Sequence, residues 1–223
     1  MTGSARSFDE VSRIAATAAL ILSALFLAIL ILLHFLKPEI NPSWRMISEY
    51  ELGQYGRMMR VDFFLWAASV VALMIALWTR LRARTGILGK SWMLLISLAL
   101  LGAGIFVTNA ITDRTANVSN DFHTICGAVV ILTFPIAASL VAACLGQNEA
   151  TSKRRFNLLA MTLLPWLGFI VFLGSDVLFG IITHDSRAGP QVLVGWPNRF
   201  MVVTYNVWLI AAATQAIRRS KAK

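Results

Sequence analysis

Long apolar runs alternate with short polar segments along the whole chain. Six of these runs, at residues 14–35, 61–78, 92–111, 122–145, 158–182 and 200–217, carry few or no formal charges. Each is about as long as the roughly 20 helical residues that cross a bilayer core of about 30 Å. Pro135 predicts a kink in the fourth run, and Pro165 predicts a break in the fifth. The pattern predicts an all-α polytopic membrane protein, a bundle of six transmembrane helices.

Composition agrees with this fold class. The chain has 223 residues, of which 57% are hydrophobic and 14% charged, whereas soluble domains carry roughly 25% charged residues. No linker, repeat or soluble segment separates the runs, so residues 1–223 are expected to form a single transmembrane domain. The net charge of +9 comes from basic residues in short loops beside the apolar runs. Such a distribution sets orientation in a membrane and does not indicate nucleic-acid binding.

The basic residues also predict which side of the membrane each loop faces. Six spans place both termini on one side, and that side carries 13 of the 20 Lys and Arg residues. Loops rich in Lys and Arg stay in the cytoplasm, so both termini are expected to be cytoplasmic. The polar stretch at residues 47–60, between the first two spans, is then expected to face outward.

The outward side collects residues that could form a site. His34, His123 and His184 all fall there, with eight of the eleven acidic residues. Asp113 follows the third run and Arg199 precedes the sixth, positions at which the helix dipole opposes the charge of each side chain. Mutual pairing of these charges would remove that cost, so we predict a polar pocket with Asp113 within reach of a basic partner. The expected binding residues are Glu49, Arg57, Asn109, Asp176 and Arg199.

Ser48, Asp113 and His123 are the candidate catalytic residues of this pocket, as a nucleophile and its acid–base partners. Each has a structural alternative. Ser48, with Glu51 three residues later, fits the capping box of a helix N-terminus. His123 lies one turn into a helix, where a histidine is commonly only solvated or hydrogen-bonded. Asn109 and Asp113 are four residues apart and are expected to share one helix face.

No motif indicates a cofactor or a metal. The sequence has no phosphate-binding loop, dinucleotide fingerprint, zincin motif or nucleophile elbow. Zinc bound by the three histidines is chemically allowed, but no ligand spacing supports it. Cys126 and Cys144 would lie about 27 Å apart on one helix, too far for a disulfide. Three glycines are expected to permit close helix packing: Gly102, Gly104 and Gly127.

Short motifs connect the chain with known families. They are Ile47-Ser48-Glu49-Tyr50 followed by Gly53 and Gly56, then Thr112-Asp113 leading to His123, and finally Gly195-Trp196-Pro197-Asn198-Arg199. Over nearly its whole length the chain resembles the bacterial and archaeal six-helix membrane proteins grouped as "domain of unknown function 998". It is distantly similar to the Frag1/DRAM/Sfk1 membrane proteins, some of which are tied to lipid-anchor remodelling. The resemblance implies a bacterial or archaeal cytoplasmic (inner) membrane and, by analogy, a lipid-related role.

Two functions fit these observations about equally. One is an enzyme or binder that uses the outer pocket for lipid headgroups or other amphiphiles. The other is a non-catalytic scaffold or accessory subunit, whose polar residues only tie the outer helix ends together. A transporter is favoured less, because the first, third, fourth and sixth runs carry no charge at midplane depth. The expected partners are membrane lipids and, for the scaffold, other membrane proteins; no cofactor is expected.

Overall fold

The protein is an all-α bundle. The computed structural model describes residues 2–113, 115–147, 152–183 and 190–221. In this part of the chain six helical segments are long and apolar enough to cross a membrane. The predicted polytopic six-helix bundle is therefore confirmed. The elements are α1 (Thr2–Leu36), the 3-10 helix η1 (Ile47–Glu51), α2 (Gly56–Leu77), α3 (Arg84–Ile105), α4 (Val118–Gln147), α5 (Ser152–Ala160), α6 (Leu163–Thr183) and α7 (Gly195–Lys221).

The third span differs most from its predicted limits. It was expected at residues 92–111, but α3 begins at Arg84 and ends at Ile105. Residues 106–113 and 115–117 lie outside the helices in what we call the 106–117 loop, because Asn, Thr and Asp side chains compete with a helix for backbone groups. The backbone N–H of Asn109, for example, donates to Asn120 Oδ1 at 2.8 Å. Asn109 and Asp113 consequently do not share a helix face, and that prediction was wrong.

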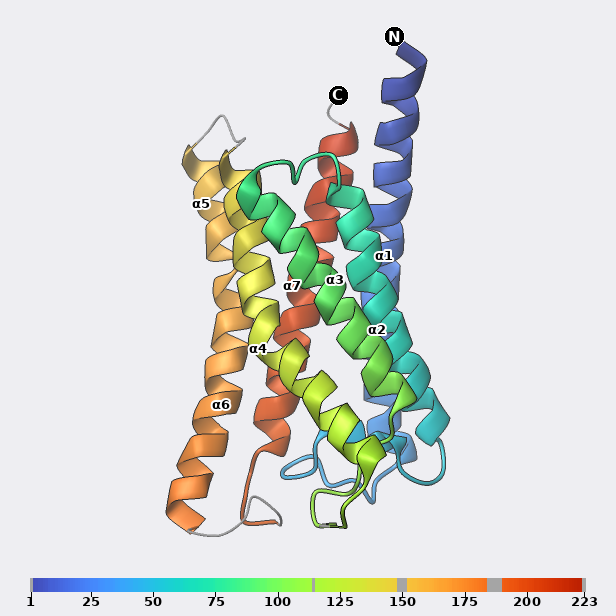
Figure 1. Ribbon diagram of the computed structural model, residues 1–223, viewed down its shortest axis with the longest axis vertical. Helices are drawn as coiled ribbons and strands as arrows, with labels where there is room; N and C mark the ends of the chain where they lie inside the picture. The colour runs from blue at the N-terminus through green and yellow to red at the C-terminus, as the bar shows by residue number, and fades with distance from the viewer. Residues whose placement is uncertain (1, 114, 148–151, 184–189, 222–223) are drawn as a thin grey trace.

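The predicted helix irregularities are found close to both prolines. The fifth span is broken between α5 and α6, and Pro165 lies in the first turn of α6. A proline is tolerated there because the N–H that it lacks would have no helical partner. Pro135 lies inside α4, which bends part-way along its length (Figure 1).

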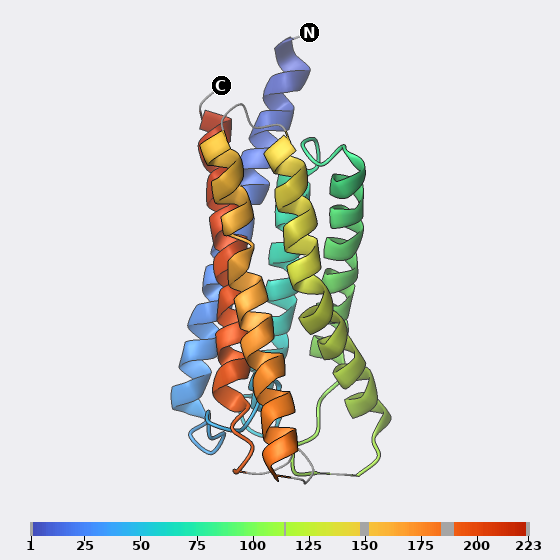
Figure 2. The same cartoon turned by 90° about the vertical axis from the view of Figure 1, so that its left-hand side faces the viewer.

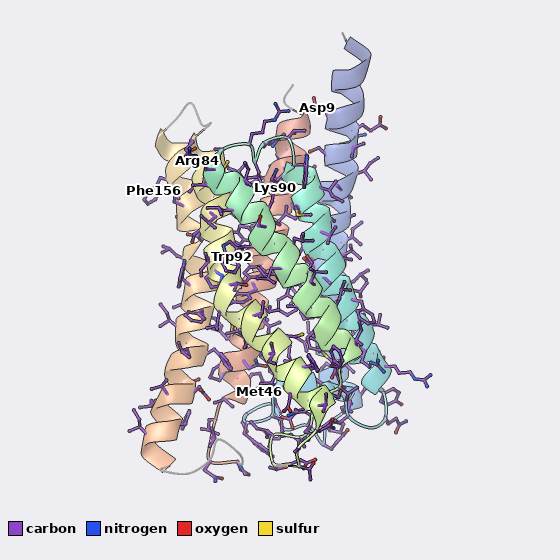
Figure 3. The ribbon with its side chains drawn as sticks, viewed as in Figure 1. Asp9, Met46, Arg84, Lys90, Trp92 and Phe156 are labelled. Atoms are coloured by element: carbon purple, nitrogen blue, oxygen red, sulfur yellow. The ribbon has the colours of Figure 1, made fainter. Side chains whose placement is uncertain are left out.

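The helices run between two ends that differ in character. Both termini lie at one end, the termini end, and η1 and the 106–117 loop lie at the other, the loop end (Figure 1). Arg84 and Lys90 lie toward the termini end and Met46 toward the loop end (Figure 3). α1 packs between α2 and α7, α3 packs on α2 and α4, and α6 packs on α7. This order leaves α4 and α6 as neighbours that share little contact surface.

Specific contacts hold the helices together, as expected where lipid provides no hydrophobic force between them. Phe134 of α4 stacks on Tyr205 of α7 with ring centroids 4.3 Å apart, and the Tyr205 hydroxyl donates to the Ile131 carbonyl at 2.9 Å. Ser12 of α1 donates to the Ala76 carbonyl of α2 at 2.6 Å. The first two contacts join α4 to α7, and the third joins α1 to α2.

Two of the three glycines predicted to permit close packing do so. A Cβ at Gly104 would lie 2.5 Å from the Phe64 ring, and one at Gly102 would lie 2.5 Å from Cys126 Sγ. At Gly127 the prediction was wrong, since no atom lies within 4 Å of the Cβ position. Gly127 instead borders a cavity.

Candidate functional site

A cavity of about 400 Å³ lies at the loop end of the bundle, within the range of about 300–1,000 Å³ typical of ligand pockets. η1, the 106–117 loop and helices α2, α3, α4, α6 and α7 all contribute to its wall. Six polar residues line it at the loop ends of their elements, and further along the helices the lining is apolar or aromatic. The polar residues are Ser48, Thr108, His123, Thr124, Asp176 and Asn198.

The cavity reaches the protein surface along α4. This helix and α6 diverge toward the loop end in both views (Figures 1 and 2). Thr124 and Ala128 of α4 line the cavity and are also exposed, and Gly127 between them contributes no side chain. A molecule in the membrane could therefore enter between these two helices.

His123 is held in a defined orientation at the polar part of the cavity. Its Nδ1 lies 2.7 Å from the Phe106 carbonyl oxygen and 3.0 Å from that of Ala103, both at the C-terminal end of α3. These carbonyls lack helical partners, so Nδ1 carries the proton and donates it. The ring nitrogen left for a ligand is Nε2, which bears a lone pair in this tautomer.

Glu51 is a buried carboxyl group beside this histidine. Its Oε2 accepts the Thr108 N–H at 3.2 Å and lies 3.5 Å from His123 Nδ1. Its Oε1 has no hydrogen-bond partner among the described residues. Burial raises the pKa of Glu51 to about 8, despite opposing effects of the Thr108 N–H and of the Arg60 charge. The group is therefore largely protonated at neutral pH.

Glu49 is a structural residue. Its Oε1 accepts the Met46 N–H at 2.9 Å, while Oε2 accepts Arg45 Nε at 2.5 Å and the Ile111 N–H at 2.9 Å. The side chain thereby starts η1 and ties it to the 106–117 loop. The capping box predicted for Ser48 was wrong, because η1 follows Met46 and Glu49 occupies the box position. Ser48 faces the cavity instead.

The turn after η1 explains the two glycines of the first motif. Gly53 has φ +67°, a left-handed conformation that glycine adopts without steric cost. A Cβ at Gly56 would collide with the backbone carbonyl of Glu51. The buried Lys37 ammonium donates to the carbonyls of Tyr50 (3.3 Å) and Leu52. Burial lowers the pKa of Lys37.

Arg199 is also structural. Only 4% exposed, it donates to His34 Nε2 at 2.7 Å and to the Tyr50 hydroxyl at 3.1 Å. It also donates to three carbonyls, of Arg45 at 2.6 Å, Gly195 at 3.1 Å and Pro42 at 3.3 Å. Arg199 thus joins α1, α7, η1 and the segment between α1 and η1. We refer to this residue and its five partners as the Arg199 cluster.

Asp113 does not take part in the predicted charge pairing. It is exposed and accepts the N–H and hydroxyl of Thr115 at 2.9 and 2.8 Å, and these hydrogen bonds lower the pKa of Asp113. No ion pair joins it to Arg57 or Arg199 in the described part of the chain. Arg57 is exposed on α2, and Asn109 Nδ2 bonds within its own loop to the Thr115 carbonyl at 3.1 Å. The predicted pairing was wrong.

Of the predicted site residues, the cavity brings together Ser48, His123 and Asp176. The sequence prediction missed Thr108, Thr124 and Asn198 as site residues. Asn198 lies in the last family motif, and its Oδ1 accepts the Ile47 N–H at 3.0 Å. Thr108 and Thr124 belong to no motif, and only the tertiary packing of the loop and of α4 places them at the cavity.

The histidines do not assemble into a metal site in the described part of the chain, where no three ligand side chains are grouped. His34 Nε2 accepts from Arg199 and its Nδ1 bonds the Leu30 carbonyl at 2.7 Å. His123 belongs to the cavity. His184 lies outside the described residues.

A sequence model of one protein family, "Protein of unknown function (DUF998)", matches residues 20–215. The chain belongs to this family. The match extends from α1 into α7, so it includes all six spans and the cavity, and it confirms the first resemblance found in the sequence. No curated protein and no solved structure matches the chain. The distant similarity to the Frag1/DRAM/Sfk1 proteins stays a prediction.

Proposed function

We propose that the cavity binds a membrane amphiphile, with its polar head near Ser48, His123 and Asp176 and its chain along the apolar wall. The observation that carries this proposal is that the polar lining residues all lie toward the loop end of the cavity, whereas the wall toward the middle of the bundle is apolar. A lipid likewise carries its polar groups at one end. The exposure of Thr124 and Ala128 beside the diverging α4 and α6 supports entry from the membrane.

Filling the cavity tests this proposal. Gly127→Phe places a ring where no atom lies within 4 Å of the Cβ position, and Gly174→Phe does the same on α6 away from the cavity lining. Both variants are expected to fold. Mass spectrometry of lipid retained through purification should find it in the parent and in Gly174→Phe but not in Gly127→Phe. Equal retention by all three proteins would overturn the proposal.

The proposal includes an orientation. Both termini lie in the cytoplasm and the loop end lies on the outer side of the membrane, an orientation that the distribution of Lys and Arg supports. The membrane is a bacterial or archaeal cytoplasmic membrane, as the family resemblance implies. In a background with Cys126 and Cys144 replaced by Ala, a Gln54→Cys variant should react with an impermeant thiol reagent on intact cells. An Ala83→Cys variant, at the other end, should react only after lysis. The opposite pattern would reverse the orientation.

Chemical modification of the bound amphiphile is a second step that the cavity could support, since Ser48 and His123 both line it. Ser48→Ala removes the hydroxyl, and His123→Gln removes the titratable base but keeps a donor. If the protein is an enzyme, each change should slow the reaction by roughly 10²-fold or more. The measurement is the lipid composition of cells lacking the protein and complemented by each variant. If both variants complement the cells fully and retain lipid normally, the protein binds the amphiphile without modifying it.

A scaffold or accessory subunit of a membrane complex is the second candidate function. It is favoured by Glu49 and Arg199, which serve the structure of the loop end itself. On this hypothesis Gly127→Phe complements cells as well as the parent does.

A further inference from the structure

Asp62 is a carboxyl group buried inside a transmembrane helix. It lies in α2, which begins at Gly56, so a rise of about 1.5 Å per residue places it about 9 Å beyond the start of the helix. Its exposed fraction is 0%, and neither carboxyl oxygen has a hydrogen-bond partner among the described residues. Phe63 and Trp66 line the cavity, but Asp62 does not. Acidic side chains within spans are rare and mark sites at which membrane proteins handle protons or ions.

The ionisable groups of the neighbouring elements do not pair with Asp62. α2 packs on α1, α3, α7 and η1, and α3 carries no ionisable residue in its half toward the loop end. The other three elements and the residue directly after α1 bring seven ionisable side chains to that half: His34, Lys37, Glu49, Tyr50, Glu51, Arg199 and Tyr205. Each of them is hydrogen-bonded to a group other than Asp62.

The two arginines of α2 itself are also placed elsewhere. Arg60 donates to the carbonyls of Gly104 at 2.9 Å and Ile105 at 3.3 Å, and Arg57 is exposed. In the described part of the chain no ion pair involves Asp62. An ionised Asp62 would therefore have no cation beside it.

Further polar atoms in the same part of the bundle lack a partner. Among the described residues, five of the seven buried side-chain nitrogen and oxygen atoms without a hydrogen bond belong to α1, α2 and α7, three helices that pack on one another. They are Ser23 Oγ, both oxygens of Asp62, Trp66 Nε1 and Asn206 Oδ1. Trp66 lies one turn beyond Asp62 on the same helix face. Its ring contacts Phe26 of α1, with centroids 4.9 Å apart.

A carboxylate that is buried without a cation or a hydrogen-bond donor is much less stable than the neutral acid, because its charge has lost the solvation of water. Binding one proton removes that charge and needs no additional space. A metal ion would need several oxygen ligands, and no three ligand side chains are grouped in the described part of the chain. We propose that Asp62 is a proton-binding site within the membrane. In this packing it is a neutral acid, and it releases its proton to water only when α1, α2 and α7 separate. The site is distinct from the cavity lining and does not depend on the proposed function.

Infrared spectroscopy tests this proposal directly, since a protonated carboxyl group has a C=O stretching band that a carboxylate lacks. Spectra at pH 7 are compared for the purified full-length parent, Asp62→Asn, Glu51→Gln and the double variant. Glu51 also holds a proton at this pH, so each single variant should lose a different part of the band and the double variant should lose both. A Glu51→Gln spectrum without a protonated carboxyl band would overturn the proposal, and this comparison does not require an Asp62 variant to fold.

Unfolding temperatures separate a proton site from a structural carboxylate. Asp62→Asn and Asp62→Leu should unfold at the temperature of the parent or above it, because neither change removes a hydrogen bond made within the protein. Glu49→Gln, which breaks the ion pair with Arg45, is the matched control and should unfold at a lower temperature. Unfolding of both Asp62 variants at the lower temperature of Glu49→Gln would overturn the proposal. An unfolding temperature of the parent that rises with NaCl but not with choline chloride, together with a missing band, would instead identify a sodium site and would also overturn it.

Discussion

The Arg199 cluster and the cavity lie at the same end of the bundle but differ in how their polar atoms are satisfied. Around Arg199, five protein acceptors receive the guanidinium donors. In the cavity, only Nδ1 of the two His123 ring nitrogens hydrogen-bonds to the protein, and Ser48 lines the same space. A polar group whose hydrogen bonds are all made within the protein stabilises the fold. An oriented group that keeps a hydrogen-bonding atom without a protein partner can bind a ligand.

The largest effect on stability is expected from Arg199→Leu. It leaves five acceptors at a buried position without their donor, which should lower the free energy of unfolding by about 3 kcal/mol or more. Arg57→Leu, an exposed change on α2, is the matched control and should stay within about 0.5 kcal/mol. Thermal unfolding in detergent measures both. If the two variants unfold alike, the Arg199 cluster is not what holds the loop end together.

Glu51 lies beside both regions, since it follows Tyr50 in η1 and its Oε2 is 3.5 Å from His123 Nδ1. Since burial raises the pKa of Glu51 from an ordinary 4.5 to about 8, the folded state holds a proton that the unfolded state releases. Stability is therefore lost as the pH rises from about 4.5 to 8. Glu51→Gln cannot ionise and should be more stable than the parent by about 2 kcal/mol at pH 8.5, with the difference vanishing near pH 4.5.

Unfolding temperatures at pH 5, 7 and 8.5 measure this difference. A Glu49→Gln variant serves as the control, because its loss of the Arg45 ion pair should destabilise the protein at every one of these pH values. A Glu51→Gln variant with the parent's pH dependence would show that another group is responsible.

Ser48→Ala should have the smallest effect on stability. The serine does not cap η1, so its loss should change the free energy of unfolding by less than about 0.5 kcal/mol. Retention of an amphiphile whose head bonds to this hydroxyl should nevertheless weaken. A clear loss of stability would instead place Ser48 with the structural residues of the loop end.

Charge and helix-end position were enough to predict that a polar cluster lies at the loop end. They did not predict which side chains of that cluster pair with one another. Asp113 was expected to need a basic partner at a helix C-terminus, yet α3 ends at Ile105 and Asp113 lies in a turn with Thr115. The expectation that Asp113 ends the third helix failed because a few Asn and Thr side chains at residues 108–120 end that helix earlier than hydrophobicity implies. Arg199, expected to meet a carboxylate, is satisfied mainly by carbonyl oxygens, which every residue carries and no motif reveals.

The sequence by itself determined the class of the protein, because each span must be apolar and helical to cross lipid and this requirement acts on every residue of the span. It also determined that the polar residues gather at the ends of the spans. Only the tertiary structure decided which of them face a shared cavity. That choice depends on the divergence of α4 from α6, on the end of α3 and on the absence of a side chain at Gly127, and these arise from contacts between distant segments.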